Sequence, residues 1–125
     1  MNFGRYILYF IRFMRNLYWS IINRYLLLAM GKVGSGFKSE GAIYFPAIQG
    51  RLELGTNCFI GPGVRIGATN NATISIGSNT SINQGTFVIA REAITIGDNC
   101  RIGEYVSIRD NDHEWRDATV RISDQ

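Results

Sequence analysis

Residues that could carry acid–base chemistry gather in one short stretch near the C-terminal end of the sequence. His113 is the only histidine among the 125 residues, and Asp110 and Asp112 stand close before it. Imidazole titrates near neutral pH, so a histidine can take a proton from a reacting hydroxyl group. A nearby carboxylate can fix the tautomer of the ring and stabilise its protonated form. The stretch therefore suits a general base with an orienting acid, whereas composition alone favours a solvated loop histidine.

The chain offers few ligands for a metal ion, and no metal is expected. A catalytic zinc site needs about three protein ligands, and the sequence holds one histidine and two cysteines that stand in no paired motif. Cys58 and Cys100 are also too few for a disulfide framework. We expect both to be small core residues of a protein in a reducing, cytoplasmic setting.

The distribution of charge argues against a nucleic-acid partner. The chain carries a net charge of +3, but residues 1–32 hold five basic residues and no acid. The remaining eight basic and ten acidic residues give the rest of the chain a charge of −2. A nucleic-acid-binding domain would carry a basic surface on its body. With 46% hydrophobic and 18% charged residues, the composition is that of one globular domain.

Residues 3–30 predict an amphipathic helix. Arginines at 12, 15 and 24 leave no run near the roughly 20 apolar residues that a membrane-spanning helix needs. Eight of the 15 aromatic residues precede position 26, and aromatics with arginines suit peripheral contact with the inner face of a membrane. The alternative is a helix packed on its own domain or on a neighbouring subunit. Spacings of three and four residues define the apolar face, formed by Ile7, Phe10, Ile11, Met14, Leu17, Tyr18, Ile21, Ile22, Tyr25 and Leu26.

A six-residue rhythm governs the chain after this helix. Aliphatic residues recur every six positions, and a second residue, often smaller, stands two positions before each of them. Residues two apart on a strand share a face. Each hexad therefore predicts a short strand with two core residues and a turn, and three hexads close one triangular coil. Insertions fall at the corners between coils. The aliphatic trios are Leu54, Ile60 and Ile66, then Ile76, Ile82 and Val88, then Ile96, Ile102 and Ile108.

Repetition at a fixed period indicates a stacked solenoid. An amphipathic antiparallel protein would show period two without a glycine every sixth residue. The sequence thus predicts an all-β solenoid over residues 33–125, with a ragged first coil, preceded by the helix at 1–32. We expect residues 109–121 to leave the last coil as a loop that carries His113, with Ile122 as the next inward residue.

Three hexads, at residues 54–59, 60–65 and 96–101, each begin with an aliphatic residue followed by glycine. These hexads resemble the hexapeptide-repeat O-acetyltransferase family, which includes acetyltransferases of O-antigen, capsule, colanic acid, maltose and galactosides. The resemblance implies a left-handed parallel β-helix, a hand that spacing does not give because parallel crossovers are nearly always right-handed. It also implies acetyl transfer from acetyl-CoA to a hydroxyl of a sugar or surface polysaccharide precursor, by a homotrimer with clefts between neighbouring β-helices. The hexads are Leu54-Gly55-Thr56-Asn57-Cys58-Phe59, Ile60-Gly61-Pro62-Gly63-Val64-Arg65 and Ile96-Gly97-Asp98-Asn99-Cys100-Arg101.

The same resemblance suggests roles for five residues. His113 would be the general base, and Asp110 or Asp112 would orient it. Asn83, which takes the place of the usual glycine after Ile82, would orient the acceptor or the histidine, although a corner amide can be simply a turn former. Trp115 would line the cleft, or serve as an ordinary interface or core anchor.

Members of this family carry further coils that bind coenzyme A, followed by a C-terminal cap. The resemblance therefore implies that C-terminal coils and the cap are missing here, and no residue is assigned to coenzyme A. The alternative to an acetyltransferase is a truncated, non-catalytic β-helix remnant or a structural, oligomerisation module.

Overall fold

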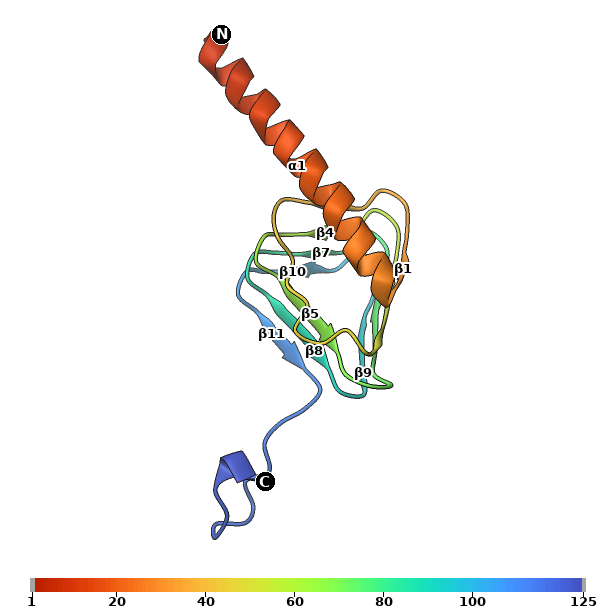
Figure 1. The fold of residues 1–125 in the computed structure, drawn as a ribbon, viewed down its shortest axis with the longest axis vertical. Helices are drawn as coiled ribbons and strands as arrows, with labels where there is room; N and C mark the ends of the chain where they lie inside the picture. The colour runs from red at the N-terminus through yellow and green to blue at the C-terminus, as the bar shows by residue number, and fades with distance from the viewer. Residues whose placement is uncertain (1, 125) are drawn as a thin grey trace.

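In the computed structural model, which describes residues 2–124, one long helix leads into a three-sided stack of short strands (Figure 1). Helix α1 spans Phe3–Met30, in agreement with the prediction. Its first turn is capped by Asn2, whose side-chain oxygen accepts from the backbone N–H of Gly4 at 3.0 Å. The strands are β1 Gly31–Val33, β2 Lys38–Ser39, β3 Arg51–Leu54, β4 Phe59–Ile60, β5 Arg65–Ala68, β6 Thr73–Ile76, β7 Ser81–Ile82, β8 Phe87–Ala90, β9 Ala93–Ile96, β10 Arg101–Ile102 and β11 Ser107–Arg109, and a short 3-10 turn, η1, covers Ile122–Asp124.

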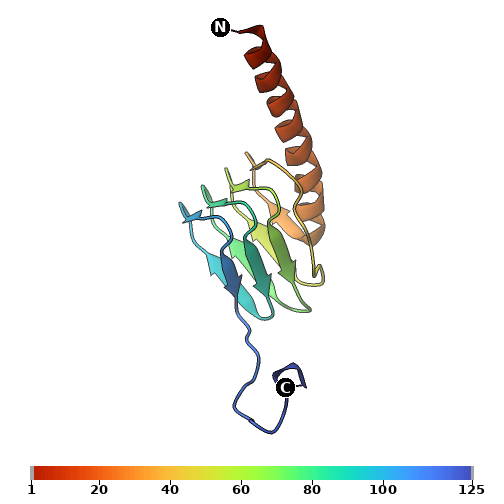
Figure 2. The same ribbon diagram turned by 90° about the vertical axis from the view of Figure 1, so that its left-hand side faces the viewer.

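Three parallel sheets form the sides of the solenoid. The first side is β1-β3-β6-β9, the second is β2-β4-β7-β10, and the third is β5-β8-β11. In Figure 1 the chain passes anticlockwise from β9 through β10 to β11, and Figure 2 shows that later coils lie farther from the viewer of Figure 1. The protein is therefore a left-handed parallel β-helix, as the hexads led us to expect.

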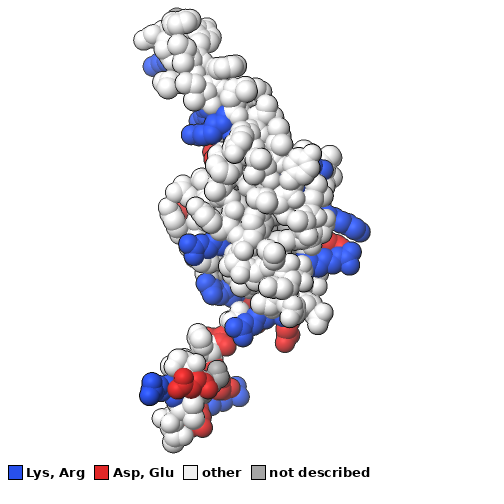
Figure 3. Space-filling view, in the orientation of Figure 1, with Lys and Arg blue, Asp and Glu red and all other residues white. Residues whose placement is uncertain are grey.

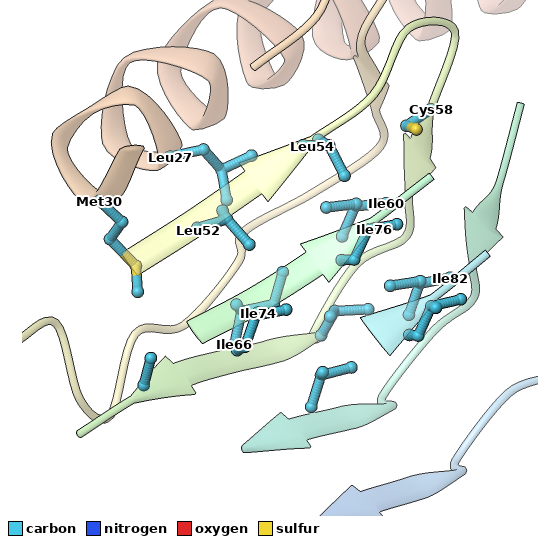
Figure 4. Close-up of a cluster of buried hydrophobic side chains, with 14 of the residues drawn as sticks. Leu27, Met30, Leu52, Leu54, Cys58, Ile60, Ile66, Ile74, Ile76 and Ile82 are labelled. Atoms are coloured by element: carbon cyan, nitrogen blue, oxygen red, sulfur yellow. The ribbon is translucent and has the colours of Figure 1, made fainter. Parts of the chain in front are cut away.

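The predicted columns of like residues form the core (Figure 4). Leu54 pairs in register with Ile76, which pairs with Ile96. On the second side Ile60 lies next to Ile82, and both are almost fully buried. Burial raises the pKa of the Cys58 thiol, since desolvation disfavours the thiolate. Both cysteines are free, as predicted.

Asparagines shape the corner between the first and second sides. Asn57, Asn79 and Asn99 have φ values of 54°, 56° and 57°, in the left-handed region that asparagine tolerates better than most residues. Each donates its backbone N–H to the coil before it, as Asn79 does to the carbonyl of Thr56 at 2.8 Å. The extra residues predicted between trios lie at the corner between the third and first sides, in the turns that join β5 to β6 and β8 to β9. These corners change direction without disturbing the columns.

The first coil is less regular than the others, as predicted. It begins at Gly31, directly after α1, and has no regular strand on the third side. Tyr44 and Ile48 instead make single bridges to Arg65 and Ala68 of β5. Helix α1 lies against β1, β2 and β3 of the solenoid and then extends well past it (Figure 2).

Candidate functional site

His113 lies on a segment that leaves the solenoid directly after β11. Residues 110–124 run away from the coils in both views (Figures 1 and 2). The imidazole is exposed, and the backbone N–H of His113 donates to Asp112 Oδ1 at 2.8 Å. The predicted departure of the chain at this point is confirmed. The prediction that Ile122 points inward is wrong, because η1 lies outside the coils and leaves that side chain 56% exposed.

Asp110 is held by the backbone of the turn between β8 and β9. Its Oδ1 accepts from the N–H of Arg91 at 2.7 Å, and its Oδ2 accepts from those of Glu92 and Ala93 at 2.7 and 2.8 Å. These hydrogen bonds lower the pKa of the Asp110 carboxyl, because they favour its charged form. Asp110 thus closes the turn between β8 and β9 and fixes the point at which the last segment departs.

Asn83 also bonds to the backbone. Its Nδ2 donates to the carbonyl of Ile102 at 2.9 Å, and its own backbone N–H donates to the same oxygen at 3.1 Å. The side chain is half-buried at the corner between the second and third sides. His113 departs from the corner between the third and first sides. Within one chain, therefore, the structure places Asn83 and His113 at different corners.

Asp112 and Trp115 accompany His113 on the departing segment. Trp115 is 69% exposed, and its backbone N–H donates to Glu114 Oε1 at 3.0 Å. Asp112 meets His113 through the backbone hydrogen bond given above. Across residues 2–124 no hydrogen bond joins a carboxylate to the imidazole ring. Of the five predicted site residues, the fold thus groups Asp112, His113 and Trp115 as neighbours in sequence and keeps Asp110 and Asn83 on the coils.

Two surface hollows of the described chain could hold a small ligand, and neither is lined by residues 110–124. The first, of about 470 Å³, lies between α1 and the second side and is lined by Phe13, Asn16, Leu17, Ser20, Phe37, Lys38, Ser39, Glu40 and Phe59. The second, of about 450 Å³, is lined by Tyr44, Pro62, Gly63, Arg65, Gln84, Gly85, Phe87 and Tyr105.

The second hollow contains part of a ladder of arginines and aromatic rings that sequence reasoning missed. The Arg65 guanidinium lies 5.9 Å from the ring centre of Tyr44 and 5.0 Å from that of Phe87, and Arg109 lies 5.4 Å from Phe87. Such contacts are attractive because the ring face carries negative charge. Arg65 and Phe87 are register partners, so aligning the outward positions of successive coils could have found this ladder.

The described residues, 2–124, contain no group of three or more histidine, cysteine, aspartate or glutamate side chains that could hold a metal ion. In the same range, no helix has the length and apolar character needed to cross a membrane.

Comparison of the chain with family models, with curated proteins and with solved structures gave no match. The fold therefore rests on the strand pairing, and the family resemblance rests on the hexads themselves.

Proposed function

We propose that this chain belongs to an O-acetyltransferase that moves an acetyl group from acetyl-CoA to a hydroxyl of a sugar or polysaccharide precursor. One observation carries the proposal. The only histidine of the chain follows the third side of a left-handed β-helix, and the hexads of that helix resemble those of hexapeptide-repeat acetyltransferases.

His113 acts as the general base in this proposal. The acceptor oxygen attacks the thioester carbonyl carbon of acetyl-CoA while a ring nitrogen of His113 takes the hydroxyl proton. The tetrahedral intermediate then loses its carbon–sulfur bond, and the imidazolium returns the proton to the departing thiolate. The products are an acetyl ester and the free thiol of coenzyme A, and the imidazole is neutral again.

Asp112, rather than Asp110, is the carboxylate that we assign to orienting the ring. Both oxygens of Asp110 already accept backbone hydrogen bonds, and turning them toward the ring would leave three N–H groups unpaired. Asp112 is exposed and bonded only to the backbone N–H of His113. A rotation about its side-chain bonds would free it to meet the ring.

A second subunit completes the site in this proposal. The exposure of His113 and Trp115 fits a cleft between neighbouring β-helices of a homotrimer, where a partner would cover both side chains. Asn83 then contributes from the adjacent subunit. The same exposure also favours the second candidate, a non-catalytic module, because a single chain builds no enclosed pocket around the imidazole.

Release of the coenzyme A thiol distinguishes the two candidates. The chain is incubated with acetyl-CoA and a panel of sugars and oligosaccharides, beside His113→Ala and the control Ser123→Ala, which changes an exposed residue on the same segment. We expect acceptor-dependent thiol release that His113→Ala lowers by about 10²- to 10⁴-fold and that Ser123→Ala leaves unchanged. No release above the protein-free rate with any acceptor would support the non-catalytic module.

A further inference from the structure

Helix α1 packs on the solenoid through its polar face. Asn23 is fully buried, and its Nδ2 donates to Ser39 Oγ at 2.8 Å and to the carbonyl of Gly41 at 2.7 Å. One turn earlier, the Ser20 hydroxyl accepts from the backbone N–H of Ser39 at 2.9 Å. Arg24 donates to the carbonyl of Gly34 at 2.7 Å. These hydrogen bonds fix which face of the helix meets the coils.

The buried apolar side chains of α1 lie in its last turns. Leu27 and Met30 are buried beside Leu52 of β3 (Figure 4). Toward the N-terminus the last contact is polar, where Arg12 and Asn16 donate to Glu40 Oε1 at 3.2 and 3.3 Å. Beyond that point the helix extends free of the coils (Figure 2).

The face of α1 that points away from the solenoid is apolar and uncovered. Of the 22 exposed large apolar side chains in residues 2–124, 16 lie on this helix. A soluble monomer rarely exposes so large an apolar surface, so we expect this face to be covered by a binding partner. Ile7, Phe10, Met14 and Ile21 follow one another at spacings of three, four and seven residues along this face.

The charge of the helix is of one sign. The charged residues of the helix are four arginines, and it contains no acid. They are Arg5, Arg12, Arg15 and Arg24. Figure 3 shows the helix as a largely uncharged surface with a few basic groups. Arg5 and Arg12 stand seven residues apart and lie on the polar side with Asn16 and Asn23, so they lie opposite the apolar face and do not interrupt it.

We propose that α1 lies in the plane of an anionic lipid bilayer, with its apolar face in the acyl boundary and with Arg5 and Arg15 among the headgroups. Interfacial helices combine such a face with basic flanks and aromatic residues. A second copy of α1 is a poorer occupant, because pairing two helices would bring Arg5 and Arg15 of both copies close together, and the helix itself contains no acid to neutralise them. The broad apolar face also differs from the narrow seam by which paired helices meet.

The packing sets the orientation of the whole protein on the membrane. Because the solenoid sits on the polar face of α1, the coils stack away from the bilayer (Figure 2). The coil that contains β9, β10 and β11 is then the one farthest from the lipid, and residues 110–124 face the aqueous side. This inference does not depend on the acetyltransferase proposal.

Flotation of the full chain with vesicles tests the proposal, with phosphatidylcholine vesicles compared with vesicles that also contain phosphatidylglycerol. Phe10→Gln and Tyr9→Gln form a matched pair, because both side chains are 63% exposed and Tyr9 lies on the polar side. We expect Phe10→Gln to weaken binding about tenfold and Tyr9→Gln to change it less than about twofold. Arg5→Gln together with Arg15→Gln should weaken binding to the anionic vesicles by about fivefold per arginine.

Three outcomes would overturn the proposal. The first is no binding to anionic vesicles, and the second is an equal loss of binding in the Phe10 and Tyr9 variants. The third is self-association through α1, seen by sedimentation as oligomers that Phe10→Gln dissociates, without vesicle binding. Circular dichroism of each variant controls for folding, which these exposed positions should not disturb.

Discussion

Asp110 illustrates how a single carboxylate can be assigned two different roles. From sequence it is a partner for His113, whereas the structure engages both of its oxygens with the backbone N–H groups of Arg91, Glu92 and Ala93. Those N–H groups lie on the last coil, which no further strand of the described chain covers. The carboxylate therefore supplies the acceptors that a following coil would otherwise provide.

Replacing Asp110 with Asn should lower the thermal stability of the chain, and the loss should depend on pH. The folded-state pKa of Asp110 lies below its ordinary value of 3.8, so the unfolded state binds more protons between the two values. The stabilisation is then present above pH 3.8 and is lost as the pH falls through the folded pKa.

Thermal denaturation of the wild type and Asp110→Asn across an acid series measures this effect. We expect a difference in Tm near neutral pH that shrinks as the solution is acidified below the ordinary pKa. A difference that stays constant, or grows, as the pH falls would show that the charge of Asp110 has no part in holding the turn.

The types of the residues and their order in the sequence predicted which residue could act as the base. They did not predict the hydrogen bonds of the other candidate site residues. The end of the hexad rhythm was enough to place His113 on a departing loop, because a broken repeat leaves no inward column to follow. The hydrogen bonds of Asp110 and Asn83 could not be predicted in this way. They depend on which backbone groups of another coil come within reach of the side chain, which is a property of three-dimensional stacking.

At the scale of the element, the corner asparagines connect sequence to turn geometry. Asn79 holds a left-handed conformation while its backbone N–H bonds to Thr56. Asn79→Ala should destabilise the protein by about 1 kcal/mol, because the Cβ of alanine clashes with the backbone in that conformation and its side chain makes no compensating hydrogen bond. Asn79→Gly should be close to wild type, since glycine adopts positive φ freely. Urea denaturation measures both, and equal stabilities for the two variants would contradict this explanation.

The stacked columns predict that an inward side chain in a middle coil contributes more to the free energy of unfolding than one in the last coil. Ile82 lies between Ile60 and Ile102 on the second side and is almost fully buried. Ile82→Ala should cost about 2–5 kcal/mol. Ile102→Ala should cost less, because that side chain is half-buried in the last coil. Denaturant titration of the two variants tests this prediction, and a larger loss at Ile102 would be inconsistent with it.

Strands and columns could be predicted because each inward position recurs in every coil, so that one pattern is observed several times. The hand of the coil could not be predicted from spacing, since either hand buries the same residues. It came from the family resemblance and agrees with the structure.

For the whole molecule, the helix is where sequence reasoning was most incomplete. Its bounds and its apolar face were predicted from periodicity, but that face is consistent with either a membrane or the protein's own core. Only the structure shows that Asn23 and its polar neighbours face the solenoid. Hydrogen bonds between distant segments decided this packing, and no local pattern encodes them.

Helix α1 at one end of the chain and residues 110–124 at the other place the two proposed functions apart in space. The proposed lipid-facing surface of α1 lies beyond the first coil, and residues 110–124 extend from the last coil (Figures 1 and 2). In the proposed homotrimer, three helices would lie on one side, and the departing segments could enter the clefts between neighbouring coils without contacting the membrane.

The most direct measurement of the proposed chemistry is chemical rescue of His113→Gly, followed by mass spectrometry of the acetylated sugar. We expect acetyl transfer to fall by about 10²- to 10⁴-fold in the variant, and added imidazole to restore part of the rate because the position is exposed. Transfer by His113→Gly at the wild-type rate, without imidazole, would contradict the assignment of His113 as the general base.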